Sequence, residues 1–192
     1  MTSLTQLHVD IETRVQSIRR HNPDWPCDKG CDRCCHRLAE IPQLTAEEWH
    51  LLQAGLAAFP QARLAEIRQD LAALAGQRSR PLLCPLLDQS TGVCPVYAQR
   101  PVACRTYGFY VQRDKGLYCP EIESRIADGL MADVVWGNHD AIDHRLAGRG
   151  ETRSLTEWFT RWARDAYALP HGGEASPNRQ KSALSLDASP PA

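Results

Sequence analysis

The stretch CDKGCDRCCH, residues 27–36, decides how this chain folds, because it places four cysteines among ten residues that are otherwise mostly charged. It has neither the period of an amphipathic helix nor the alternation of a strand, so we predict a loop. Thiolates at such spacing can reach one metal centre, and they favour zinc, copper(I) or iron–sulfur clusters over calcium and magnesium. Cys34 and Cys35 are adjacent, so this pair can serve two sites, or one of its sulfurs can bridge two ions.

A second set of cysteines lies further along the chain, in the proline- and glycine-rich segment 80–120. Proline directly follows Cys84, Cys94 and Cys119, and it reduces the entropy lost when a loop is ordered around a metal. The spacings are too wide for a simple zinc knuckle, and they do not reveal which cysteines share a centre. All eight cysteines are candidate metal ligands: Cys27, Cys31, Cys34, Cys35, Cys84, Cys94, Cys104 and Cys119.

Apolar residues at three- and four-residue steps predict helices on both sides of these loops. Thr45 with Glu48, and Ser154 with Glu157, have the spacing of capping boxes at helix starts. We expect an N-terminal helix over 1–20, a cysteine-cluster domain over 21–170 and a disordered Ser/Pro-rich tail over 171–192. The domain should contain a helical hairpin over 45–76, helices at 121–131, 140–146 and after 154, and short strands at 93–97 and 107–112. The predicted fold class is mainly α, a small helical domain with irregular cysteine-rich loops tied together by metal.

Composition excludes several classes of protein. The 192 residues carry 22 Lys plus Arg against 23 Asp plus Glu, and this balance argues against a nucleic-acid binder. No run approaches the roughly 20 apolar residues of a membrane span, and the N-terminus lacks the pattern of a secretory signal. We therefore expect a cytoplasmic protein, with neither membrane nor nucleic acid as partner. Lasting disulfides are rare in the reducing cytoplasm, so eight cysteines there favour metal binding.

The cysteines could also have roles without a metal. One or two could be small buried hydrophobes, but that does not suit a run interleaved with charged residues. A disulfide framework is a second alternative, and a redox pair at Cys31 and Cys34, which form a C-x-x-C, is a third. His36 could add a ligand, although a histidine beside a cluster is more often a hydrogen-bonding neighbour. No phosphate loop, nucleophile elbow or zinc-hydrolase histidine pair is present, so the sequence leaves open whether the protein is an enzyme.

Two arginines bracket one of the later cysteines. Arg100 and Arg105 lie on either side of Cys104 and could donate hydrogen bonds to its sulfur. Four thiolates around one zinc ion carry a net charge of −2, which is costly to bury without such compensation.

The segment CPVYAQRPVACR, residues 94–105, together with Cys31, Cys34 and Cys35, resembles a bacterial family described as zinc- or iron-chelating, also called YkgJ-type. The resemblance covers roughly 27–120, and Cys84 and Cys119 look like the additional cysteines of the family. Three residues separate Cys27 from Cys31, where the family has two. Members are often labelled iron–sulfur proteins. A related arrangement occurs in flagellin lysine methylases, but this chain shows no methyl-donor domain, so that activity is not carried over.

Three hypotheses follow. The favoured one is an iron–sulfur protein with a redox or protein-modifying role, because adjacent thiols and irregular spacing suit a multinuclear centre. The second is a structural or chelating zinc protein. The third is an adaptor that binds a partner protein and uses metal only to hold its fold. A protein or redox partner is expected under the first and third.

Overall fold

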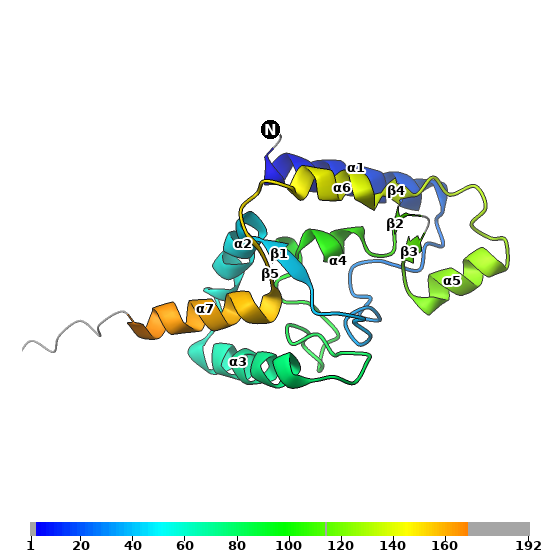
Figure 1. Cartoon of the computed structure of the whole chain (residues 1–192). Helices are drawn as coiled ribbons and strands as arrows, with labels where there is room; N and C mark the ends of the chain where they lie inside the picture. Colours follow the sequence, from blue (N-terminus) through cyan, green and yellow to red (C-terminus); the bar gives the residue numbers. More distant parts are fainter. Residues whose placement is uncertain (1–2, 114, 169–192) are drawn as a thin grey trace, which may run out of the picture.

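The computed structural model describes residues 3–113 and 115–168 (Figure 1). Seven α-helices and two small sheets form within these residues, so the mainly α fold predicted from sequence is confirmed. The helices are α1 Leu4–His21, α2 Ala46–Leu56, α3 Gln61–Gly76, α4 Val102–Thr106, α5 Pro120–Ala127, α6 His139–Leu146 and α7 Leu155–Ala168, with a 3-10 turn η1 at Tyr97–Gln99. None of the helices in 3–113 and 115–168 has the length and apolar character needed to cross a membrane. The predicted disordered tail lies outside the described residues.

The strands are short and pair residues that are far apart in the sequence. They are β1 Gln43–Thr45, β2 Tyr110–Gln112, β3 Lys115–Leu117, β4 Gly137–Asn138 and β5 Thr152–Ser154. One sheet is the antiparallel pair β1–β5, and the other has the order β3–β2–β4, in which β2 and β4 are parallel.

Both predicted capping boxes are present, and each follows one strand of the β1–β5 pair. Thr45 accepts a hydrogen bond from the Glu48 amide, and the Glu48 carboxylate accepts one from the Thr45 amide at 2.9 Å. Ser154 and Glu157 repeat this arrangement at the start of α7. Because the strands are antiparallel and Gln43 pairs with Ser154, α2 and α7 begin at opposite ends of this strand pair.

The buried side chains form two hydrophobic cores. The first, which we call the α3/α7 core, contains Leu44, Trp49, Leu52, Leu56, Leu64, Ile67, Leu71, Leu86, Val96, Leu155, Trp158 and Phe159. The second, the α1/α6 core, contains Leu7, Ile11, Val15, Ile18, Trp25, Val102, Phe109, Tyr110, Ile122, Met131 and Ile142. Figure 1 shows α1 beside α6 along one edge of the molecule and α3 near α7 at the opposite side. A salt bridge of 2.6 Å between Asp10 and Arg145 joins α1 to α6.

Local structure departs from the predictions in the second cysteine segment. No strand forms at 93–97; residue 93 makes one isolated bridge to Asp88, and the chain then turns into η1. Pro95 has no N–H to give to a ladder, which explains this loss. The strand predicted at 107–112 is limited to β2, because Gly108 adopts a φ of +87°. Helix α4 was not predicted, and it begins directly after Pro101.

Two helical predictions also need adjustment. The helix expected over 121–131 is α5, which ends at Ala127; Gly129 then adopts a φ of +76°. Both helices of the predicted hairpin over 45–76 form, but α3 packs chiefly along α7, and α2 contacts η1 and β1.

Candidate metal centre

Helix α1 fixes the start of the first cysteine loop. The Arg19 guanidinium donates to the Cys27 carbonyl at 2.9 Å and pairs with Asp28 at 3.1 Å. Its carbon Cζ lies 5.1 Å from the centre of the Phe109 ring. Within the loop, the Cys31 amide donates to the backbone carbonyl of Asp28, and the Cys35 amide donates to the backbone carbonyl of Asp32. These bonds place four thiols on one compact turn structure.

The two cysteine loops lie together, joined by backbone hydrogen bonds. Leu38 and Leu82 form a bridge with bonds of 2.9 and 2.8 Å, and the Cys84 amide donates to the Cys35 carbonyl at 2.7 Å. The bridge therefore brings the second loop against the end of the first, and Cys84 lies next to Cys35. That a metal ties these loops stays a prediction.

Cys27 and Cys119 pack against the α1/α6 core. The Cys27 sulfur lies 4.0 Å from the Tyr107 carbonyl oxygen. A Cβ on Gly108 would lie 3.0 Å from that same sulfur, so only glycine lets the backbone approach Cys27 this closely. Burial raises the pKa of Cys27 to about 12, with smaller contributions from the neighbouring thiols of Cys31, Cys34 and Cys119.

Cys84 and Cys94 pack instead against the α3/α7 core. Cys104 lies on α4 and keeps exposed surface, yet the protein packed around its thiol raises its pKa to about 12. The thiols of Cys34, Cys35 and Cys94 add to that shift. Burial also raises the pKa of Cys94.

Cys34 and Cys35 stand between these two groups, with their sulfurs 4.0 Å apart. The contact with Cys35, followed by burial, raises the pKa of Cys34. The contact with Cys34 lowers the pKa of Cys35, but the contact with Cys84 and burial outweigh it and raise that pKa to about 12. Thiols held neutral in this way must lose protons when they bind a metal.

The predicted arginines both lie beside the second loop. Arg100 stacks on Tyr97, with Cζ 3.7 Å from the ring centre, and its positive charge favours the thiolates of Cys94 and Cys104. Its Nε is buried without a hydrogen-bond partner among the described residues. Arg105 donates to the carbonyl oxygens of Arg100, at 3.0 Å, and of Ala98. Donation by either arginine to a sulfur stays a prediction.

His36 is oriented by a carboxylate. Its Nε2 lies 3.0 Å from an Asp32 carboxylate oxygen. Whether His36 is a metal ligand or only a neighbour of the cluster stays a prediction.

The donor set fits a soft metal. All eight cysteines carry free thiols, and seven of them are partly buried. The Nε of Arg100 supplies a buried donor that a thiolate could satisfy. Within 3–113 and 115–168, the side chains do not bring three His, Cys, Asp or Glu groups around one point. Ligation would therefore need the thiol side chains to move closer together.

Comparison with known families agrees with this chemistry. A family model described as "Putative zinc- or iron-chelating domain", CxxCxxCC, matches residues 26–123. The chain belongs to this family. Residues 26–123 of this CxxCxxCC protein, which include both cysteine loops, correspond to that domain, and the resemblance seen in the sequence is confirmed. Neither the curated proteins nor the solved structures include a match to the chain.

Sequence reasoning missed the residues that position the cysteines. Arg19 and Tyr107 act through contacts between distant segments, which no local pattern reveals. Glu48 was recognised as a capping residue, but its other oxygen also accepts from the Val102 amide at 2.9 Å, at the start of α4. Gly108 follows the C-cap residue Tyr107 of α4, and because that short helix was not predicted, the sequence carried no signal for this glycine.

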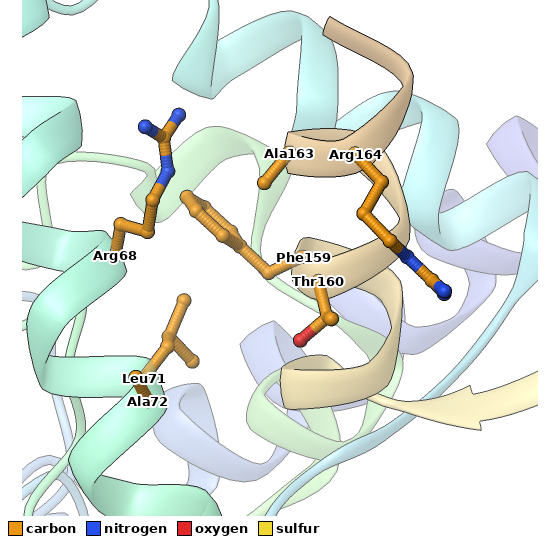
Figure 2. Close-up of a pocket in the computed structure, with 7 residues that line it drawn as sticks. All are labelled: Arg68, Leu71, Ala72, Phe159, Thr160, Ala163 and Arg164. Atoms are coloured by element: carbon orange, nitrogen blue, oxygen red, sulfur yellow. The ribbon is translucent and has the colours of Figure 1, made fainter. Parts of the chain in front are cut away.

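A separate pocket lies away from the cysteines, between α3 and α7 (Figure 2). Its volume is about 570 Å³, and Leu71 and Phe159 contribute apolar surface from the two helices. None of its lining residues is a cysteine, so we assign no metal chemistry to it.

Proposed function

We propose that this CxxCxxCC protein is an iron–sulfur protein that works in electron transfer or in a redox-dependent protein modification. One observation carries the proposal: the adjacent Cys34 and Cys35 thiols lie 4.0 Å apart, with further thiols on either side. Two adjacent thiolates with other cysteines nearby suit a centre that contains several metal ions. Iron–sulfur clusters are held by such thiolates.

The surroundings support a redox role. The α1/α6 core, against which Cys27 and Cys119 pack, contains Trp25 and Phe109, with Tyr118 at its margin. Apolar burial and limited water access tune the potential of a cluster. When bound, the cluster would supply a one-electron step.

Access to a partner is the other requirement of electron transfer. Among the eight cysteines, all within the described residues, Cys104 alone is exposed. We propose that a redox partner protein docks over α4, the helix that carries this exposed residue.

Zinc is the alternative, and a specific observation favours it. Every candidate ligand is a thiol, and four thiolates would leave a zinc ion no open position, as in structural sites. In that case the protein would be a chelator, or an adaptor whose metal holds the fold.

Anaerobic purification of the full chain tests the choice. Iron, zinc and acid-labile sulfide should be quantified on the sample used for the visible spectrum. A broad band near ~400 nm, with iron and sulfide in similar amounts, is the expected result. A colourless protein with stoichiometric zinc would overturn the iron–sulfur proposal and support the alternative.

A further inference from the structure

Three positively charged side chains gather around Tyr97, which lies in η1. The Lys29 ammonium, from the first cysteine loop, lies 5.7 Å from the centre of the Tyr97 ring, and Cζ of Arg100 lies 3.7 Å from it. Both distances are within the range of cation–π attraction. Arg105, on α4, donates to the carbonyl oxygens of Ala98 and Arg100, so its charge is held against the same turn. We call Lys29, Arg100 and Arg105 the basic cluster.

The basic cluster has no acidic partner among the described residues. Within 3–113 and 115–168, none of its three side chains forms an ion pair. The acids of the first loop have other partners: Asp28 pairs with Arg19 at 3.1 Å, and Asp32 lies 3.0 Å from His36. The carbonyl oxygens that Arg105 contacts carry no net charge to offset its own. Three like charges are therefore held together without a carboxylate to reduce their mutual repulsion.

The surface around the basic cluster suits contact with another protein. Tyr97 is half-buried and Lys29 is exposed, and the neighbouring Ala98, with Ala103 and Cys104 on α4, is exposed as well. The small side chains of these last three residues let the surface of a partner approach α4 closely. Tyrosine and arginine are also among the residues enriched at the centres of protein interfaces.

A role confined to the metal centre does not account for the whole cluster. The charge of Arg100 favours the thiolates of Cys94 and Cys104, as described above. The Lys29 side chain, by contrast, is exposed, and no hydrogen bond in the described part of the chain joins Lys29 or Arg105 to a sulfur. Lys29 and Arg105 therefore carry charge that is available to a molecule outside this chain.

We propose that the basic cluster is the docking surface for an acidic partner protein, whose carboxylates pair with Lys29 and Arg105 around Tyr97 and beside Cys104. The proposal rests on the proposed function for what the partner does, and it adds the chemistry by which the partner is recognised. Complementary charge speeds encounter and selects partners more than it adds affinity, which suits a partner that must dock and leave. Three cations on a chain of net charge −1 match a local acidic patch better than the long phosphate backbone of a nucleic acid.

Cross-linking of the full chain to an acidic probe locates the surface. The probe is a synthetic peptide of alternating glutamate and serine, and a carbodiimide joins its carboxylates to lysine amines that lie against them, with loss of water. The chain has lysines at positions 29, 115 and 181 only, so peptide mapping reads the site directly. Cross-links concentrated at Lys29 are expected. Equal cross-linking of all three lysines would overturn the proposal.

Fluorescence anisotropy with the labelled peptide measures the contribution of charge. Lys29→Glu should weaken binding about fivefold, because it removes one exposed attraction and adds a repulsion of similar size. Lys29→Gln removes only the attraction and should weaken binding about twofold. Arg14→Glu is the matched control, since Arg14 is an exposed residue of α1 outside the basic cluster, and it should change binding by less than Lys29→Gln does. Equal losses for Lys29→Glu and Arg14→Glu would overturn the proposal.

Two competitors complete the test. A peptide with glutamine in place of glutamate should not displace the probe, and displacement by it at equal concentration would show that charge is not what is recognised. A single-stranded oligonucleotide that displaces the probe at a lower concentration than the unlabelled acidic peptide would overturn the choice of a protein partner. The iron–sulfur proposal fails separately, through the visible spectrum and sulfide content, and a zinc protein that binds the acidic peptide at Lys29 would keep the docking surface intact.

Discussion

Glu48→Gln should destabilise the protein far more than its conservative size suggests. The Glu48 side chain is 3% exposed, and its two oxygens accept three hydrogen bonds. One oxygen receives the Thr45 amide and hydroxyl, both at 2.9 Å, and the other receives the Val102 amide at 2.9 Å. Glutamine has one acceptor oxygen, so its NH₂ group must face a donor on one side or the other.

The magnitude follows from these three bonds. A hydrogen bond to a charged group contributes about 1.5–3 kcal/mol, and an unpaired buried donor costs a further 1–3 kcal/mol or so. Removing the buried charge relieves part of its desolvation cost, which opposes these losses. We expect a net loss of about 2–3 kcal/mol in the free energy of unfolding. Since Val102 begins α4, the helix that carries Cys104 should fray as well.

Urea unfolding of the reduced, metal-free protein measures this loss. With a slope near 2 kcal/mol/M, the midpoint should fall by about 1 M. Glu66→Gln is the matched control, because Glu66 is an exposed helical carboxylate paired with Arg63 at 2.8 Å, and it should cost less than about 0.5 kcal/mol. Equal midpoints for the two variants would refute the assigned role of Glu48.

Three further predictions concern the thiols and their surroundings. Metal affinity should fall as pH falls, because the neutral thiols of Cys27, Cys35 and Cys104, with pKa values near 12, must release protons when they bind metal. Calorimetry in buffers of different ionisation enthalpy should detect the released protons, and metal binding without proton release would contradict the role of these thiols as ligands. The folded metal-free protein holds the thiol protons more tightly than the unfolded chain, whose thiols have the ordinary pKa of 9.0. The stability that these protonated thiols contribute should therefore be present below pH 9 and lost as pH rises toward 12, and urea midpoints that stay constant across this range would contradict the prediction. Gly108→Ala should destabilise the protein by about 1 kcal/mol more than Gly30→Ala, because both glycines have positive φ but only the Cβ added at Gly108 would lie 3.0 Å from the Cys27 sulfur. Thermal melts that show equal destabilisation by the two substitutions would show that this close approach carries no cost.

The sequence predicted those parts of the fold that local chemistry determines. The apolar stripe of α1 and the capping box at Thr45 act within one or two helical turns, so their patterns are visible in the chain. The pairing of β1 with β5 is not visible in the sequence, because each strand has only three residues and its partner lies more than a hundred positions away. Helix α4 is too short to show a period, and its first amide depends on Glu48.

The candidate ligands were all visible in the sequence, but their grouping was not. The spacing of the cysteines left open which of them share a centre. In the folded chain Cys119 packs with Cys27, and Cys84 lies beside Cys35. Such partners are chosen by long-range backbone contacts, which the spacing of cysteines does not encode.

The β1–β5 pair also bears on how this protein can be dissected. Residues 26–123, which match the family, contain β1 but lack β5, α1, α6 and α7. An excised fragment with these boundaries would lose Leu7 and Ile11 from one core, and Leu155 and Phe159 from the other. Apolar side chains of both cores, against which the cysteines pack, would then be exposed to water. The family segment is therefore not a transplantable module, and grafting it onto another protein would move the ligands without the scaffold that orients them.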